Sequence, residues 1–182
     1  MQNVVIRAIE RLDFRTKEAY KTLRTNLSFA GKNVKVISLT SCTPNEGKTS
    51  VSFQLCLSLA ESGKQTILVD ADLRKSVLRG RYKANREKYG LSHYLSGQVE
   101  LDDACCRTNV NNFDIIFAGP VPPNPSELLG GDAFRNMLEV LRMKYDYVIV
   151  DTPPLGSVID AAIVGAICDG TVIVVESGAI SY

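Results

Sequence analysis

The sequence contains no tryptophan, a single histidine and no excess of charge of either sign. Its 21 Lys and Arg residues are balanced by 20 Asp and Glu residues, so the net charge of +1 gives no electrostatic argument for binding to nucleic acid or to a membrane surface. No apolar run approaches the roughly 20 residues of a membrane-spanning helix. The N-terminus also lacks the apolar core of a signal peptide. These absences predict a cytoplasmic chain that binds no nucleic acid.

Metal-binding cysteine pairs are absent too, because no two of the five cysteines are spaced as Cys-x-x-Cys. An odd number of cysteines in a reducing compartment favours free thiols. Cys42 precedes a predicted helix, where it is either an oxidation-sensitive thiol or a small residue that fills a loop. The lone His93 is interpreted as a surface or hydrogen-bonded side chain rather than as a catalyst.

A predicted strand, a loop and a predicted helix follow one another between residues 34 and 62. The strand covers the apolar residues 34–40, and residues 47–62 carry an apolar stripe at helical spacing. Between them, Gly47, Lys48 and Thr49 match the end of the phosphate-binding pattern G-x-x-x-x-G-K-[ST], whereas Cys42 stands where its first glycine is expected. The alternative is a chance turn before a helix, but the strand and the helix on either side favour a phosphate-binding loop (P-loop).

The chemistry of a P-loop assigns roles to its residues. Backbone N–H groups and the helix N-terminus attract phosphate oxygens, Lys48 would reach the terminal phosphates, and the Thr49 hydroxyl would ligate Mg²⁺. The predicted nucleotide-binding residues are Thr43, Pro44, Asn45, Glu46, Gly47, Lys48, Thr49 and Ser50.

Two further predicted strands end in aspartates. The apolar run 66–69 leads into Asp70 and Asp72, whose side chains point the same way in an extended segment. The run 147–150 leads into Asp151, the expected Mg²⁺ partner in a protein with a P-loop. Because ligands bind beyond the carboxyl ends of parallel strands, we expect these carboxylates to face one site. The alternative for the Asp70–Asp72 pair is that one of them caps a following helix.

The alternation of strands with helices predicts an α/β fold in one domain, residues 1–182, with a mostly parallel sheet covered by helices on both faces. Further strands are predicted at 113–117 and 171–176, and further helices at 13–30, 91–95, 132–144 and 160–168. The proline-rich residues 118–129 are predicted to form an extended, stiff connector. Only six residues follow the last predicted strand, which is too few for a helix that covers it. A C-terminal helix and tail are therefore expected to be missing.

Charged residues gather in two segments whose role the residues alone leave open. Residues 74–88 hold seven Lys and Arg residues against Glu87, which indicates either attraction of an acidic peptide or phosphates, or a solvated helix face. Glu18, Lys21 and Arg24 lie three residues apart on the predicted helix 13–30, and composition alone favours a solvated face with weak ion pairs.

Taken together, these motifs resemble the bacterial tyrosine kinases (BY-kinases) of capsule and exopolysaccharide assembly, over about residues 18–182. Residues 67–74, ILVDADLR, are similar to the family's motif of apolar residues followed by D-x-D-x-R, and residues 148–154, VIVDTPP, to its Walker B form. Residues 90–92 and 119–129 resemble connectors typical of the group. The resemblance implies a P-loop NTPase fold, ATP and Mg²⁺ as cofactors, and autophosphorylating protein-tyrosine kinase activity.

The resemblance also implies residue roles. Asp70 would take the proton from a substrate tyrosine, and Lys48 would hold the ATP phosphates. Asp72 would act with them in catalysis, and the metal would be supported by Thr49, Asp72 and Asp151.

The same family implies an assembly. Residues Glu18, Lys21 and Arg24 are similar to its oligomerisation motif E-x-x-R-x-x-R, with lysine in place of the first arginine. Because lysine lacks the planar fork of arginine, we expect weaker ring assembly. The implied partners are a transmembrane polysaccharide co-polymerase adaptor, whose cytoplasmic tail activates the kinase at the inner face of the membrane, and a cognate tyrosine phosphatase. The family's tyrosine-rich tail is expected to be missing beyond Tyr182.

Two alternatives to a kinase remain from the sequence. One is a switch-type P-loop ATPase of the partitioning or division-site class, which carries an extra lysine where this chain has Thr43. The other is a non-catalytic nucleotide-binding scaffold that acts through residues 18–24. The complete set of motif residues argues against a scaffold, and Thr43 argues against the switch ATPase.

Overall fold

The computed structural model describes residues 1–31, 33–85 and 87–178. Its strands form one sheet in the order β1-β4-β5-β3-β6-β2-β7. The strands are β1 (Gln2–Val4), β2 (Val36–Ser41), β3 (Thr66–Asp70), β4 (Cys106–Thr108), β5 (Phe113–Ile116), β6 (Tyr147–Asp151) and β7 (Gly170–Val174). All neighbouring strands pair in parallel except β4 and β5, which are antiparallel. The predicted mostly parallel α/β fold is therefore confirmed.

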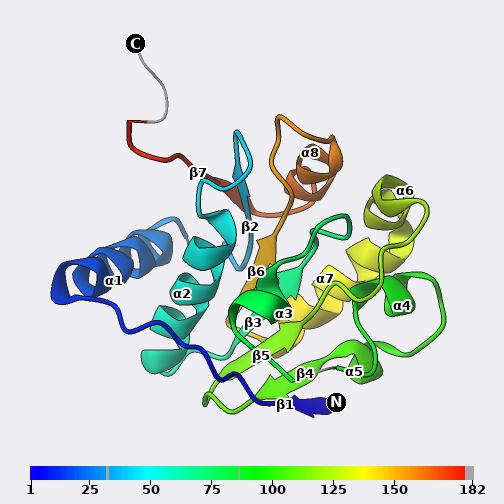
Figure 1. Cartoon of the computed structure of the whole chain (residues 1–182), viewed down its shortest axis with the longest axis horizontal. Coiled ribbons are helices and arrows are strands. Elements are labelled where there is room, and N and C mark those ends of the chain that lie inside the picture. The colour runs from blue at the N-terminus through cyan, green and yellow to red at the C-terminus, as the bar shows by residue number, and fades with distance from the viewer. Residues whose placement is uncertain (32, 86, 179–182) are drawn as a thin grey trace.

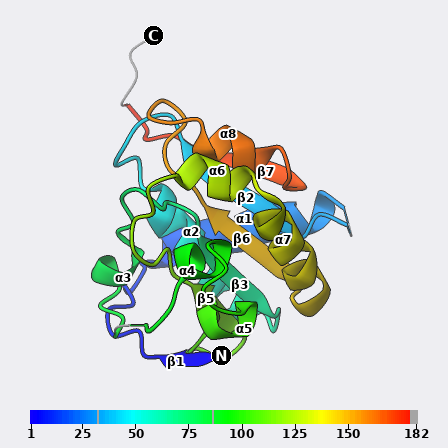
Figure 2. The ribbon, with the colours of Figure 1, turned by 90° about the vertical axis from the view of Figure 1, so that its right-hand side faces the viewer.

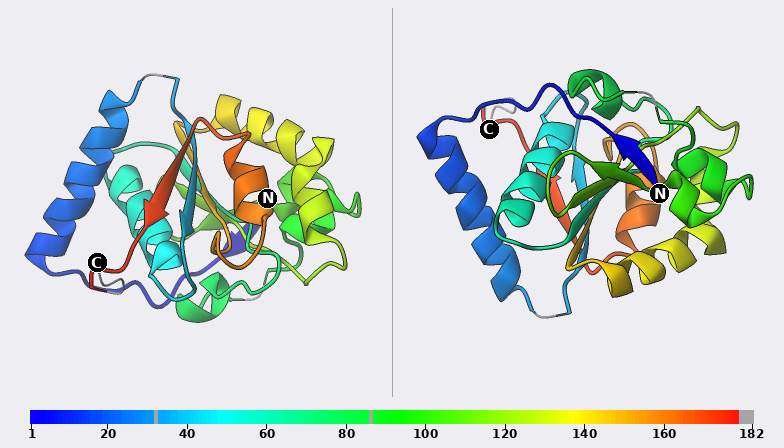
Figure 3. Two further views of the ribbon diagram at one scale, coloured as in Figure 1. Left: turned by 90° about the horizontal axis from the view of Figure 1, so that it is seen from above. Right: turned by 90° about the horizontal axis from the view of Figure 1, so that it is seen from below.

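Helices cover both faces of this sheet, as the alternating pattern predicts. They are α1 (Phe14–Phe29), α2 (Lys48–Glu61), α3 (Leu78–Arg81), α4 (Leu91–Leu95), α5 (Leu101–Ala104), α6 (Pro125–Gly130), α7 (Asp132–Lys144) and α8 (Asp160–Gly165). Figure 1 shows α1 and α2 on one side of the sheet and α6, α7 and α8 on the other. Figure 2 looks onto the second group, and Figure 3 shows the strands between the two helical layers. No helix among the described residues combines the length and apolar character needed to cross a membrane.

The core divides into two apolar clusters, one on each face of the sheet. On β6, Val148 and Val150 join the cluster that contains Phe134 of α7, whereas Ile149 joins the cluster that contains Phe53 of α2. This alternation follows from the period of two along a strand, and the near-continuous apolar run 147–150 is typical of a parallel strand that is buried on both faces. The central strands are thus rigidly held on both sides.

Several short elements differ from the sequence-based expectation: α3 and α5 were not predicted, and α8 ends at Gly165 rather than at residue 168. The three-residue strands β1 and β4 were not predicted, because runs this short carry no periodic signal. The proline-rich connector is also shorter than predicted, since α6 begins at Pro125 within residues 118–129. Proline lacks an N–H group and has a φ suited to the first turn of a helix, so it starts α6 rather than excluding it.

The strand order determines where the site lies. β6 lies between β2 and β3, and all three run parallel, so their carboxyl ends meet at one edge of the sheet. In the register of β3 and β6, Asp70 is directly paired with Asp151. The sheet therefore brings together two carboxylates that are separated by 81 positions in the chain.

Candidate active site

The loop between β2 and α2 has the backbone geometry of an anion site. Asn45 has a φ of 69° and Gly47 a φ of 87°, both in the left-handed region. Gly47 is the N-cap of α2, and no side chain caps the helix there. The N–H groups of the first turn of this 14-residue helix are therefore available to a phosphate, and the helix dipole adds partial positive charge.

A cavity of about 220 Å³ opens at this loop. Of the eight predicted nucleotide-binding residues, the ones that line it are Pro44, Asn45, Gly47, Lys48 and Thr49. The other three support the loop from outside the cavity. The backbone N–H of Thr43 donates to Oε2 of the buried Glu46 at 2.7 Å, and the Ser50 hydroxyl accepts a hydrogen bond from Arg81.

Lys48 lies between two carboxylates at the floor of the site. Its Nζ is 3.6 Å from Oδ2 of Asp72 and 3.7 Å from Oδ2 of Asp151. The Thr49 hydroxyl donates to Oδ2 of Asp151 at 2.6 Å, and the Ser52 hydroxyl donates to Oδ1 at 3.1 Å. All five side chains are buried. The structure thus brings the predicted lysine and hydroxyl together with Asp72 and Asp151 in one cluster of ion pairs and hydrogen bonds.

Asp70 is a strongly perturbed acid beside this cluster. It is 1% exposed, and burial together with the negative charge of Asp151 raises the pKa of its carboxyl to about 8. The hydroxyl of Ser76 donates to Oδ2 of Asp70 and opposes this rise. Burial also raises the pKa of Asp151, against the positive charge of Lys48 and the two hydroxyl donors. A carboxyl with a pKa near neutrality is suited to accept and release a proton.

Three residues that the sequence did not single out as site residues support the cluster. Ser52 is four residues after Lys48, so the two share a face of α2, and that spacing is a signal that the sequence contains. Ser76 reaches Asp70, and Asp160, which is fully buried, accepts from Nε of Arg74 at 2.8 Å and from the Ser126 hydroxyl at 2.6 Å. The contacts of Asp160 cross 86 and 34 positions, so only the fold reveals them.

The donors at this site fit a magnesium–nucleotide complex. Mg²⁺ is held in such sites by one or two protein oxygens together with water and phosphate oxygens. The Thr49 hydroxyl and the Asp151 carboxylate are buried, adjacent oxygen donors, and Asp72 lies on the other side of Lys48. No cluster of three or more His, Cys, Asp or Glu metal ligands occurs among the described residues.

The predicted oligomerisation residues lie away from this site on α1. Lys21 and Glu18 form an ion pair of 2.7 Å on the exposed face of the helix. Arg24 is turned towards α2, where its Nη1 donates to the backbone carbonyl of Ser58 at 2.6 Å. Within one chain, therefore, Arg24 connects two helices, and the role of the three residues in assembly stays a prediction.

Comparison with known proteins identifies relatives of this chain. A family model described as an AAA domain matches residues 34–182. Tyrosine-protein kinase CpsD of Streptococcus agalactiae is 45% identical over 166 residues, which cover 91% of this chain and 72% of CpsD. The kinase domain of the Escherichia coli tyrosine kinase ETK superposes with a TM-score of 0.87 at 34% identity, over 100% of this chain and 80% of that one.

A more distant structure shows how widely the fold is shared. The cell division ATPase MinD of Pyrococcus furiosus superposes with a TM-score of 0.64 at 25% identity, over 78% of this chain and 59% of that one. The similarity is thus both higher and more complete towards the tyrosine kinases than towards this ATPase. The P-loop, the paired aspartates and this similarity together establish that the chain belongs to the bacterial tyrosine-protein kinase family.

Proposed function

We propose that this chain is an ATP-dependent protein-tyrosine kinase in which Asp70 is the catalytic base. The observation that carries the proposal is the position of Asp70, a buried carboxyl with a pKa of about 8 that lies beside the P-loop cluster. The ionised Asp70 takes the tyrosine O–H proton while the phenolic oxygen forms a bond to the γ-phosphorus of ATP. The bond from that phosphorus to the bridging oxygen breaks, and ADP leaves.

Lys48, Thr49 and Asp151 position the nucleotide in this proposal. The lysine neutralises the charge of the terminal phosphates, and the N–H groups at the start of α2 bind their oxygens. Mg²⁺, held by Thr49 and Asp151 with support from Asp72, would neutralise the negative charge that develops on the phosphates. Phosphoryl transfer requires mainly positioning and charge stabilisation, which the buried, hydrogen-bonded cluster is built to supply.

The cellular setting follows from the family and is part of the proposal. The kinase would regulate capsular or exopolysaccharide synthesis and export as a homo-oligomer that contacts its neighbours through Glu18, Lys21 and Arg24. It would be recruited to the inner face of the membrane by a transmembrane adaptor, whose cytoplasmic tail activates it. A cognate tyrosine phosphatase would reverse the modification.

The second candidate is a switch-type ATPase, which the structural similarity to MinD favours. One assay separates the two. The purified chain is incubated with Mg-ATP, a tyrosine-rich peptide and the cytoplasmic tail of a candidate adaptor, and both phosphotyrosine and free phosphate are followed. We expect phosphotyrosine from the wild type and none from Asp70→Asn, which keeps its affinity for ATP but cannot accept the proton. Free phosphate without phosphotyrosine would identify the switch ATPase.

A further inference from the structure

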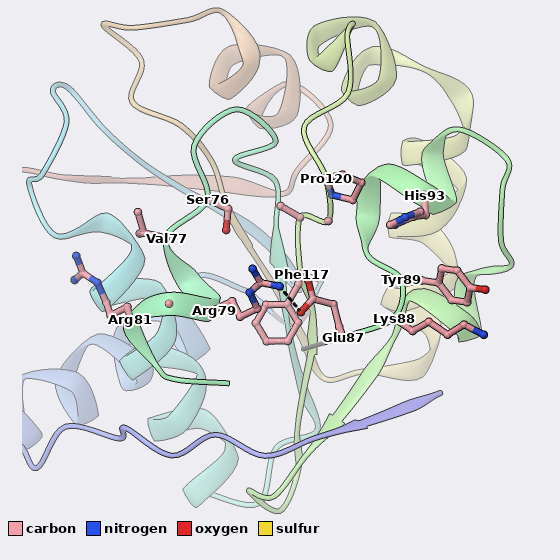
Figure 4. Close-up of a pocket in the computed structure, with 13 residues that line it drawn as sticks. Ser76, Val77, Arg79, Arg81, Glu87, Lys88, Tyr89, His93, Phe117 and Pro120 are labelled. Atoms are coloured by element: carbon pink, nitrogen blue, oxygen red, sulfur yellow. Dashed lines mark ion pairs between the residues drawn. The ribbon is translucent and has the colours of Figure 1, made fainter. Parts of the chain in front are cut away.

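A second and larger cavity, of about 820 Å³, adjoins the nucleotide cavity. Val77 and Arg81 line both of them, so the two spaces meet at the segment that follows the D-x-D-x-R motif. Figure 4 shows this cavity, with Ser76 and Val77 at one end and Tyr89 and His93 at the other. The volume lies in the range of sites that enclose a small ligand or a side chain with its neighbours.

Ser76 connects this cavity to the catalytic carboxyl. It is a lining residue, and its hydroxyl donates to Oδ2 of Asp70. A group that enters the cavity and displaces Ser76 from Asp70 would therefore reach the base directly. Val77, Phe117 and Pro120 contribute apolar atoms to the lining of the same cavity, which suits an aromatic ring with a terminal hydroxyl.

Among the charged residues that line the cavity, the cationic side chains are more exposed to solvent than the acidic one. Arg79 is 50% exposed, whereas its partner Glu87 is 9% exposed and 3.6 Å away, between Nη1 and Oε2. Oε2 of Glu87 is buried with no hydrogen-bond partner among the described residues, so this carboxylate acts through its charge on Arg79. Lys88 at the rim is exposed, with its Nζ 4.9 Å from the centre of the Tyr89 ring. An entering ligand thus meets cations before it meets the carboxylate.

His93 adds a hydrogen-bond donor at the far end. Its Nδ1 accepts the backbone N–H of Gly90 at 3.1 Å, which leaves the proton of the neutral imidazole on Nε2. The Tyr89 ring packs edge-on against the imidazole, with 5.5 Å between the ring centres. The imidazole is therefore held in one orientation, with a donor for a carboxylate or a backbone carbonyl of the ligand.

We propose that this cavity binds the acceptor peptide, an extended segment in which a tyrosine is flanked by Asp or Glu residues. The tyrosine ring lies against Val77 and Phe117, its hydroxyl replaces Ser76 at Asp70, and the flanking carboxylates contact Arg79, Lys88 and His93. The inference rests on the proposed kinase function and assigns its substrate class. It also gives a role to the basic segment 74–88 that composition alone left undecided.

The test compares two peptides of equal length, one with glutamates around the tyrosine and one with glutamines. Phosphorylation kinetics are measured for the wild type, for Lys88→Gln and for the double variant Arg79→Gln/Glu87→Gln. Both members of the ion pair are replaced together, because removing Arg79 alone would leave the buried carboxylate of Glu87 without its cation. Arg135→Gln on α7 is the control, because it removes one exposed cation that does not line the cavity. We expect the wild type to favour the acidic peptide in kcat/KM, and each cavity variant to reduce that preference about two- to fivefold with the KM for ATP unchanged.

A binding experiment keeps the test independent of catalysis. Fluorescence anisotropy is measured without ATP for the acidic peptide carrying phenylalanine in place of tyrosine. If the cavity variants bind this peptide more weakly and Arg135→Gln does not, the result supports the cavity as the peptide site. That conclusion holds even if no peptide is phosphorylated, because a lack of phosphorylation would count only against the kinase proposal. Equal phosphorylation and equal binding of both peptides by the wild type would overturn the acidic specificity. A raised KM for ATP in the variants would assign the cations to the nucleotide instead.

Discussion

Replacing Ser76 by alanine tests whether Asp70 is the base. The Ser76 hydroxyl donates to the Asp70 carboxylate and so favours its ionised form. A hydrogen bond to a charged group contributes about 1.5–3 kcal/mol, which corresponds to about one to two pKa units. Without it, the pKa of Asp70 in the free enzyme should rise from about 8 to about 9 or higher.

The pH profile of kcat/KM for the peptide follows from this shift. With a pKa of about 8, about a tenth of Asp70 is ionised at pH 7, and a rise of one unit lowers this to about a hundredth. Ser76→Ala should therefore react up to roughly tenfold more slowly at pH values below the wild-type midpoint, and regain the wild-type rate at pH values well above its own midpoint. Bound Mg²⁺ would lower both midpoints, so the difference between variant and wild type is the quantity to measure.

The assay is peptide phosphorylation between pH 6 and pH 10 at saturating Mg-ATP. Ser76→Thr is the matched variant, because it keeps a hydroxyl at the same position and should restore the wild-type midpoint. A Ser76→Ala profile that is lower by the same factor at every pH, with its midpoint unchanged, would show that the serine only shapes the cavity. A midpoint that moves to lower pH would refute the assigned interaction between Ser76 and Asp70.

Three further predictions concern the site and its surroundings. Lys48→Met should abolish productive nucleotide binding, since it leaves Asp72 and Asp151 without their cation; calorimetric titration with Mg-ATP would measure this. Asp70→Asn should stabilise the nucleotide-free protein, by up to about 4 kcal/mol at pH 7. Between about pH 4 and pH 8 the Asp70 carboxyl is protonated in the folded state but ionised in the unfolded state, and this difference lowers the stability of the wild type. The gain should grow with pH over this interval in urea unfolding, and a constant difference would contradict the raised pKa. Arg24→Ala should lower the melting temperature by a few degrees, because the contact with Ser58 is lost, and Lys17→Ala on the same helix should not.

The nucleotide-binding loop could be predicted largely from local sequence patterns. The strand, the loop and the helix around Lys48 were predicted because apolar periodicity and a glycine before a helix are local signals. Asp13 caps the start of α1 by accepting a hydrogen bond from the Thr16 N–H at 2.8 Å, a contact between residues only three positions apart. Asn45 adopts the left-handed conformation, which asparagine tolerates better than most residues.

The contacts that tune the site depend on topology instead. That Asp70 and Asp151 are direct strand partners follows from β6 lying between β2 and β3, an order that no local pattern specifies. The Arg74–Asp160 pair joins segments 86 residues apart, and Glu87 was identified only as the exception in a basic segment. Burial of these acids, and with it their chemistry, could not be predicted before the sheet was assembled.

The three carboxylates of the site carry more negative charge than its lysine can neutralise. Asp70, Asp72 and Asp151 share the single cation of Lys48 among the buried side chains of the cluster. Hydroxyl donors compensate only part of this charge, so the negative charge of Asp151 adds to the effect of burial in raising the pKa of Asp70. A divalent cation at Thr49 and Asp151 would reduce the repulsion between the carboxylates. It would thereby lower the pKa of Asp70 and favour the ionised form of that residue. The base would then be available chiefly when the metal and the nucleotide are bound, which would limit proton abstraction to the complex that is able to transfer phosphate.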